Sequence, residues 1–384
     1  MNSRFHQYSL LTLLVIMTAG CSSGESTPAA EFSLSVSIAG PGSGTVVSTP
    51  AGIHCGTDCS ENYPENSIIT LTASRTAGSS FAGWSGACNG TAGCDVSMDS
   101  AKSVTATFIE YSVDCSAYAA YVPARTPEIT LSSSGAAATT LVLMHGKAGS
   151  PLDAYLAPLA TALSDAGYDV VVPYLPWSET AWDGAMCEAM NYIDSLAAAE
   201  ALKGRNVVIA GHSMGGAHAL IYAATAPSDE VKAVITLAPG HFPHLELPLL
   251  ILLDPINASS IASSTTLAEE MVAAGNGDQL NTFDTLIPDL NNPLLQISAT
   301  ANHYLSYHAL DQFPDINDVL PVIKLPVLWL AGTDDELTDL YNMAVLSGQI
   351  ASNGSLYQPV SGDHLDMVSN SALAVTAWML SLGL

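Results

Sequence analysis

Residues 207–216, which read VVIAGHSMGG, decide the fold of this 384-residue chain. An apolar run typical of a buried strand leads into the pattern Gly-x-Ser-x-Gly, and a predicted helix follows. In this pattern the serine lies on a sharp turn, and the flanking glycines leave room for neighbouring backbone. The helix that begins at Met214 points its positive N-terminus at the turn, where it stabilises developing negative charge. Ser213 is therefore the predicted nucleophile, and the alternative is an ordinary strand–loop–helix junction.

A base and an acid for this serine are expected after two later strands. A hydroxyl group needs a base within hydrogen-bond reach and a third group that orients the base. The predicted strand at 327–331 is followed by the sequence GTDD, and the one at 356–360 is followed by SGDH. We predict that His364 is the base and Asp335 the acid, with Asp334 as the second choice.

Acyl transfer also needs two backbone N–H groups to stabilise an oxyanion. The Met214 N–H, directly after the serine, is the first predicted donor. The second is expected in the loop at residues 145–150, HGKAGS, which follows the apolar strand 141–144. We assign it to the Lys147 N–H.

Apolar strands alternate with helices through most of residues 116–384. This order predicts a parallel sheet that helices cover on both faces, with functional sites at the carboxyl ends of the strands. The stretch from about 240 to 322 is too long for a plain loop, and we expect a helical cap there. Further expected strands are 168–173 and 231–238, and expected helices are 154–166, 185–201 and 216–224.

These features resemble the α/β-hydrolase fold family over residues 139–384. The resemblance is carried by His145-Gly146, GHSMGG at 211–216, GTDD at 332–335 and Asp363-His364. It implies an eight-stranded, mostly parallel sheet, a Ser-Asp-His triad and no cofactor. It is specific for the fold and the triad, but it does not identify the substrate.

Residues 31–110 differ from the remainder and are rich in Gly, Ser, Thr and Val. Segments such as 32–38 alternate with period two, which predicts a small domain of short β-strands. Motifs from GSGTV at 42–46 to VTATF at 104–108 resemble the internalin-type B repeat, a β-grasp-like module of bacterial surfaces. The resemblance implies a spacer or weak binder. Trp84 is expected in the core, and a glycan-stacking residue is the alternative.

Residues 1–20 are predicted to be a signal peptide. Arg4 precedes an apolar run at 10–17, and small residues follow it. The ending AGC resembles a bacterial lipobox, in which Cys21 would be lipidated, although Thr18 replaces the usual aliphatic residue. A simple cleaved signal is the alternative, and residues 21–30 read as a tether. We therefore expect an exported protein of the bacterial cell envelope, lipid-anchored or secreted.

The chain has 7 cysteines, so six remain besides Cys21. An even number in an exported chain favours disulfides, although sequence alone allows many pairings. A zinc site is the alternative, but the spacings differ from those of zinc thiolate sites. We predict the pairs Cys55–Cys59, Cys88–Cys94 and Cys115–Cys187.

The formal net charge is -27, from 9 Lys+Arg against 36 Asp+Glu. Such a surface repels phosphate backbones and anionic lipids. We therefore expect no nucleic-acid partner and membrane contact only through a lipid anchor. Motifs for phosphate, haem or metal do not stand out, and we expect no metal.

The predicted reaction is hydrolysis of a small-molecule carboxylic ester through an acyl-enzyme. Apolar cap residues suggest an acyl or aromatic substrate, and the alternative is that they form the cap's own core. Cleavage of an amide, thioester or carbon–carbon bond stays open, as does an inactive surface binding protein on the same scaffold. The cap residues in question are Leu245, Leu247, Phe283, Leu286, Tyr304 and Tyr307.

Overall fold

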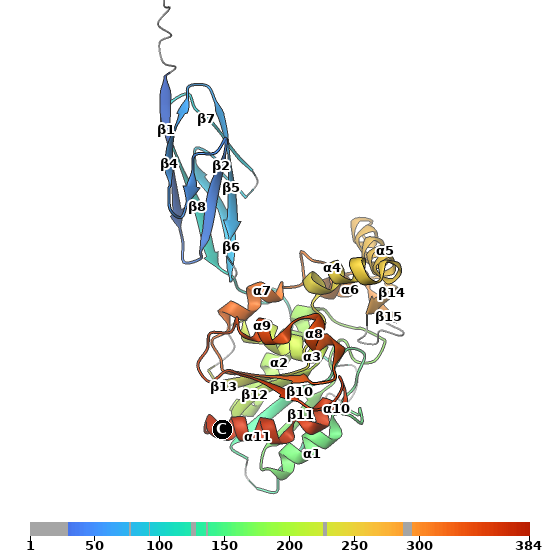
Figure 1. Ribbon diagram of the computed structural model, residues 1–384. Coiled ribbons are helices and arrows are strands. Elements are labelled where there is room, and N and C mark those ends of the chain that lie inside the picture. Colours follow the sequence, from blue (N-terminus) through green and yellow to red (C-terminus); the bar gives the residue numbers. More distant parts are fainter. Residues whose placement is uncertain are drawn as a thin grey trace, which may run out of the picture.

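The computed structural model describes residues 30–76, 78–91, 93–123, 128–135, 137–225, 229–286 and 294–384. The predicted signal peptide, Cys21 and nearly all of the predicted tether lie outside the described residues. A slender β domain leads into a larger layered domain that holds the remainder of the chain (Figure 1).

Strands of the small domain form two four-stranded sheets, in the orders β4-β1-β8-β6 and β3-β2-β5-β7. Alternate residues such as Leu34 and Val36 of β1 turn inward and form one core with residues of the other sheet. Trp84 lies in that core, as expected. The strands are β1 (Glu31–Ala39), β2 (Gly44–Thr49), β3 (His54–Cys55), β4 (Ser60–Pro64), β5 (Ile68–Arg75), β6 (Ser79–Gly86), β7 (Cys94–Ser97) and β8 (Lys102–Glu110).

The large domain is built on a seven-stranded sheet with the order β17-β16-β13-β12-β10-β11-β9. Every neighbouring pair is parallel except β11 with β9. The mostly parallel sheet of the prediction is confirmed. Its strands are β9 (Glu128–Leu131), β10 (Thr139–Met144), β11 (Asp169–Pro173), β12 (Asn206–His212), β13 (Val231–Leu237), β16 (Val327–Gly332) and β17 (Leu356–Val360).

Seven described strands are one fewer than the eight that the family resemblance implied. Residues 111–123 do not pair with the sheet and are held on helix α2 (Met186–Ala201) instead. A disulfide joins Cys115 to Cys187, and the Asn191 side chain donates to the carbonyls of Cys115 and Tyr118 at 3.0 and 2.7 Å.

Helices cover both faces of the sheet, which explains why its strands are apolar throughout. Successive residues of β10 alternate between the two faces. Leu141 and Leu143 pack with α1 (Ala157–Asp165) and α11 (Ala372–Ser381) on one face. Val142 and Met144 pack with helices on the other face. Figure 1 shows α1 and α11 on one side of the sheet and α2 and α3 (Met214–Ala223) on the other. Three short helices complete this domain, α8 (Glu336–Leu340), α9 (Met343–Ser347) and α10 (Asp366–Asn370).

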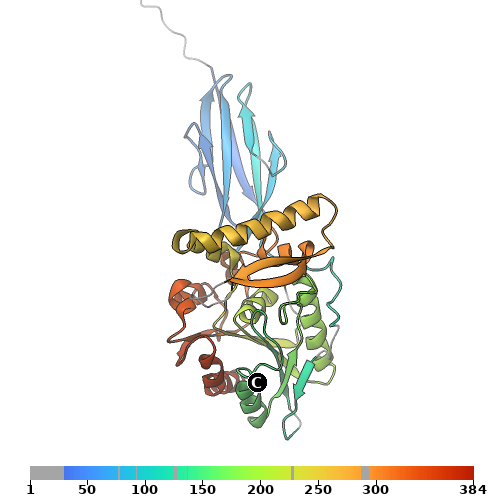
Figure 2. The same cartoon turned by 90° about the vertical axis from the view of Figure 1, so that its right-hand side faces the viewer.

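The cap lies between β13 and β16 and contains a β-hairpin as well as the expected helices. Phe283 and Thr285 of one strand and Ile297 and Ala299 of the other are buried at alternate positions. Helix α5 lies across this hairpin (Figure 2). The cap consists of α4 (Pro243–Leu253), α5 (Pro255–Ala273), β14 (Leu280–Leu286), β15 (Leu294–Thr300), α6 (Ala301–His308), α7 (Ile316–Val319) and a 3-10 turn (Leu320–Val322).

The two domains meet where β5 ends. The Arg75 guanidinium forms an ion pair with Asp318 of α7. The Tyr111 N–H, just after β8, donates to the Gly78 carbonyl at 3.0 Å. None of the described helices is both long and apolar enough to cross a bilayer.

Candidate active site

Ser213 lies on the predicted strand–turn–helix elbow, between the end of β12 and the start of α3. Its backbone angles are φ 53° and ψ -121°, a strained region for a residue with a side chain. A Cβ at Gly211 would lie 2.1 Å from the Gly215 carbonyl oxygen, and one at Gly215 would lie 2.6 Å from the His145 carbonyl oxygen. The turn can therefore close only with glycine at both places, as the motif requires.

His364 and Asp335 meet at the carboxyl ends of β17 and β16. The His364 Nδ1 lies 2.9 Å from the Asp335 Oδ2. The other oxygen, Oδ1, accepts from the Leu337 N–H at 3.0 Å, and the residue is only 6% exposed. Asp334, the second choice, is exposed and accepts from its neighbour Thr333 instead. Of the two adjacent carboxylates, only Asp335 can orient the imidazole.

His364 keeps one unused nitrogen beside the elbow. Its Nδ1–H donates to the carboxylate, so Nε2 carries a lone pair, and this buried atom has no hydrogen-bond partner among the described residues. The His364 ring lies 4.7 Å from the ring of His212, which directly precedes the serine. The His364 carbonyl also contacts the His212 Nε2 at 2.8 Å. The described residues thus bring the base to the elbow without a Ser213–His364 hydrogen bond, and such bonds often shorten only with substrate present.

The backbone N–H groups of Met214 and Lys147 lie beside the serine, and neither has an acceptor among the described residues. The groups that flank Lys147 are both engaged. The Gly146 N–H donates to the Tyr155 hydroxyl at 3.0 Å, and the Ala148 N–H donates to the Trp177 carbonyl at 3.1 Å. A Cβ at Gly146 would lie 3.1 Å from the Ser213 Cβ, so this loop packs directly on Ser213.

The Lys147 side chain has a second role that sequence reasoning missed. Its Nζ donates to the Thr285 Oγ1 at 3.2 Å and to the Leu286 carbonyl at 2.5 Å, both on β14 of the cap. Burial lowers the pKa of Lys147 to about 8, although the Glu246 carboxylate acts in the opposite direction. The only signal in the sequence was a lysine in a loop expected to face the site.

His308 fixes the direction of the hydrogen bonds around that lysine. Burial, with the positive charge of Lys147 as a smaller cause, lowers the pKa of His308 to about 3. The ring is therefore neutral, and its Nδ1 donates to the Tyr304 carbonyl at 3.0 Å. Its Nε2 must then accept from the Thr285 hydroxyl, 2.8 Å away. The Thr285 oxygen in turn accepts from Lys147.

A cavity of about 460 Å³ contains Ser213 and has a mostly apolar lining. Its wall includes Leu249, Leu250 and Leu253 of α4 and Leu337 and Leu340 of α8. Such a wall can hold an apolar group of a substrate next to the nucleophile.

A second cavity of about 430 Å³ adjoins the first. The two share Lys147, His241, Glu246, Leu250 and Leu286. Among the cap residues singled out in the sequence, Leu286 lines both cavities and Leu247 lines the second. Leu245, Phe283, Tyr304 and Tyr307 pack in the hydrophobic core instead, which was the alternative interpretation.

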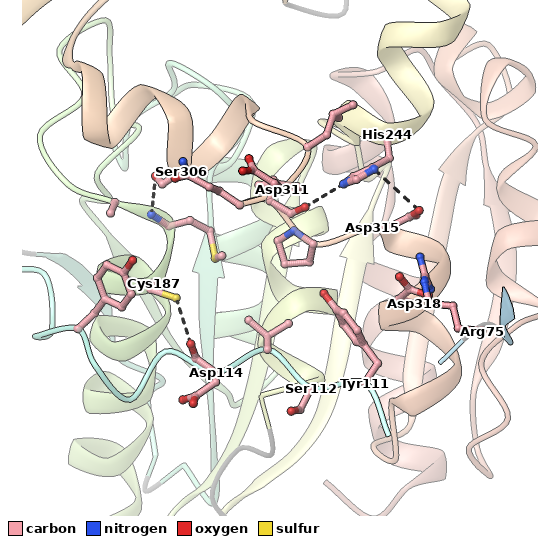
Figure 3. Close-up of a pocket in the computed structure, with 18 residues that line it drawn as sticks. Arg75, Tyr111, Ser112, Asp114, Cys187, His244, Ser306, Asp311, Asp315 and Asp318 are labelled. Carbon is pink, nitrogen blue, oxygen red and sulfur yellow. Dashed lines mark hydrogen bonds and ion pairs between the residues drawn. The ribbon is translucent and has the colours of Figure 1, made fainter. Parts of the chain in front are cut away.

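A third cavity, of about 530 Å³, lies elsewhere. It lies where the β domain meets the cap and contains none of the three triad candidates (Figure 3). Its labelled side chains include Arg75 and Tyr111 from the β domain side and Asp311, Asp315 and Asp318 from the cap side. The described residues contain no group of three or more side chains suited to hold a metal ion.

Comparisons with known proteins give two family matches. A model described as alpha/beta hydrolase fold matches residues 139–371, and one described as a divergent InlB B-repeat domain matches residues 35–112. Among curated proteins, none matches the chain.

Similar solved structures include lipases and an esterase. A monoacylglycerol lipase from Paleococcus ferrophilus is 20% identical, with a TM-score of 0.46, over 66% of this chain and 98% of its own. Est1E from Butyrivibrio proteoclasticus is 18% identical, with a TM-score of 0.45, over 66% and 93%. A monoglyceride lipase from Saccharomyces cerevisiae is 14% identical, with a TM-score of 0.45, over 66% and 90%.

Proposed function

Because the chain belongs to the α/β hydrolase fold family, we propose that it is a serine hydrolase that cleaves a small-molecule carboxylic ester through an acyl-enzyme. One observation carries the proposal. The His364 imidazole is held by Asp335 at 2.9 Å and keeps an unused acceptor beside the elbow of Ser213.

The first half-reaction forms the acyl-enzyme. The His364 Nε2 takes the proton of the Ser213 hydroxyl as its oxygen attacks the ester carbonyl carbon. The carbonyl oxygen becomes an oxyanion and accepts hydrogen bonds from the N–H groups of Met214 and Lys147. When this intermediate collapses, the carbon–oxygen bond to the alcohol breaks, and His364 donates its proton to the leaving oxygen.

Water completes the turnover by the same route. His364 removes a proton from a water molecule, whose oxygen attacks the acyl carbon. When this intermediate collapses, the bond from the acyl carbon to the Ser213 oxygen breaks, His364 returns its proton to that oxygen, and the carboxylic acid leaves. Asp335 fixes the imidazole tautomer and stabilises the imidazolium. The leucine-lined cavity next to the serine favours an apolar acyl group.

Export is also part of the proposal. Three disulfides suit an oxidising compartment, and the sequence before residue 21 has the pattern of a signal peptide. We propose that Cys21 is lipidated and becomes the first residue of the mature chain, and that the B-repeat domain serves as a spacer.

A fluorophosphonate probe tests the nucleophile. We expect the probe to label the wild-type protein and not a Ser213→Ala variant. Folded wild-type protein that resists the probe would instead support an inactive binding protein.

A panel of p-nitrophenyl esters tests the bond and the acyl group. Each methylene buried in the leucine-lined cavity contributes about 0.8 kcal/mol, so kcat/KM should rise roughly fourfold per methylene until the cavity is filled. Matched amides and thioesters of the best acyl group serve as controls. Faster cleavage of either would reject ester hydrolysis as the main activity.

A further inference from the structure

The outer face of the cap carries a run of exposed aliphatic side chains. Ile251, Leu252, Leu253 and Ile256 are 59%, 77%, 67% and 80% exposed. We call these four residues the cap patch. Residues 251–253 are the one place in the described chain where exposed large aliphatic residues follow one another directly. Single exposed aliphatic residues are ordinary on protein surfaces, but a contiguous group marks a contact site.

Helix α4 has an apolar surface that the described residues leave partly uncovered. Its sequence, PHLELPLLILL, is apolar on nearly every side, yet Pro243 is the only fully buried residue in it. A helix that is apolar all round is normally buried in a core or in lipid. The described residues supply no such cover over the cap patch.

The cap patch borders the catalytic cavity. Leu253 belongs to the patch and also lines the cavity that contains Ser213. Leu249 and Leu250, one turn earlier on the same helix, line that cavity as well. A surface that covers the patch therefore lies next to the proposed site of reaction.

The charges of the cap restrict what this surface can be. Between Lys232 and Lys324 the sequence contains no lysine or arginine. Acidic residues lie beside the patch: Asp254 falls within it along the chain, and Glu246 and Glu336 line the same cavity as Leu253. An anionic membrane would be repelled, whereas an electrically neutral surface would not.

We propose that the cap patch docks on electrically neutral lipid surfaces, from which the enzyme takes an ester substrate. A folded protein or a second copy seated on Leu253 would obstruct the cavity that substrate must enter. A lipid surface instead offers acyl chains to the leucines of α4. The delivery of substrate rests on the proposed function, but the docking itself does not.

Vesicle sedimentation tests the docking. All proteins carry Cys21→Ser, which removes the thiol that could be lipidated. We expect binding to phosphatidylcholine vesicles and weaker binding when phosphatidylglycerol is added. Replacing Ile251, Leu252 and Ile256 together by serine should lower the partition coefficient at least tenfold, because each buried side chain contributes to binding. None of these three residues lines a described cavity, and all are exposed, so the fold and the hydrolysis of soluble esters should be unchanged.

Leu373→Ser provides a matched control, because Leu373 is 81% exposed on α11, on the far side of the sheet from the cap (Figure 1). It should bind vesicles like the wild-type protein. Three results would overturn the docking proposal: no binding of wild-type protein to phosphatidylcholine, equal binding by the triple variant and the control, or a wild-type dimer that the triple variant loses.

The Ser213→Ala variant separates this proposal from the proposed function. It should dock normally while it hydrolyses nothing. If wild-type protein docks but cleaves no ester in the panel, the proposed function fails and the docking stands.

Discussion

At the scale of single residues, the triad candidates follow from strand ends. Ser213 directly follows β12, and Asp335 and His364 lie in the loops that follow β16 and β17 of the same sheet. The carboxyl ends of such parallel strands share an edge. The spacing Gly-x-x-Asp after the strand favoured Asp335 but left Asp334 open as a second choice. The structure distinguishes them because only the Asp335 side chain is buried against His364.

Asp335→Asn should lower kcat/KM for an ester by about 10⁴-fold, because the amide would no longer hold the imidazole in the required tautomer. The neighbouring Asp334→Asn variant is the matched control and should stay close to the wild-type value. Steady-state kinetics with one p-nitrophenyl ester measure both. Equal losses in the two variants would reject Asp335 as the orienting residue.

The Lys147 side chain lay beyond sequence reasoning. Its partner Thr285 is 138 residues away and lies on a strand that the helical pattern of the cap did not reveal. The role of the Lys147 N–H could be predicted from the motif around it, whereas the contact of its side chain with a distant segment could not.

The pH dependence of stability should report the buried ammonium of Lys147. Its pKa falls from 10.5 to about 8 in the folded chain, mainly through burial. Between these values the unfolded chain holds the proton and the folded chain does not, so this group makes folding more favourable as pH rises. Below pH 8 both states are protonated and the folded state bears the full cost of burial.

Urea unfolding at pH 7.5 and pH 9.5 measures this effect in wild-type protein and in Lys147→Met. The gain in unfolding free energy between the two pH values should be larger in the wild-type protein than in the variant. An equal change in both would show that the ammonium is not buried as described.

At the scale of elements, the sheet strands are predictable because both of their faces are covered, so each is an uninterrupted apolar run. The hairpin β14–β15 is not, because its short alternating segments lie among helices and resemble helical patterns over a few residues. The attachment of the segment around Cys115 to α2 was predicted only as a disulfide, because the two cysteines are 72 residues apart in sequence.

The turn between β12 and α3 leaves no room for a side chain at Gly211. A methyl group there would lie 2.1 Å from the backbone oxygen of Gly215, so the elbow must shift. Gly211→Ala should destabilise the domain by about 1–3 kcal/mol and reduce activity. Gly135→Ala is the control, because nothing lies within 4 Å of a Cβ at that position. Thermal unfolding compares the two, and similar melting temperatures would contradict the expected strain.

At the scale of the whole molecule, the Cys115–Cys187 disulfide joins the segment after the β domain to the body of the large domain. It closes a loop with a sequence separation of 72, whereas Cys55–Cys59 closes one of 4. In the chain-entropy model these loops correspond to about 4 and about 2 kcal/mol of stabilisation.

Replacing both Cys115 and Cys187 by alanine should therefore lower the unfolding free energy more than the same change at Cys55 and Cys59. Urea unfolding of the large domain, followed by tryptophan fluorescence, measures the first loss. If the first pair proves neutral, the unfolded chain must already be compact around α2, and the entropic account of this disulfide is wrong.

The direction of β1 has a consequence for where the enzyme can work. β1 is parallel to β8, and β8 ends at the junction with the large domain, so β1 begins at the opposite end of the small domain (Figure 1). Its 9 residues cover about 30 Å. If the chain is anchored through Cys21, as we propose, the small domain thus separates the anchor from the large domain by the length of β1.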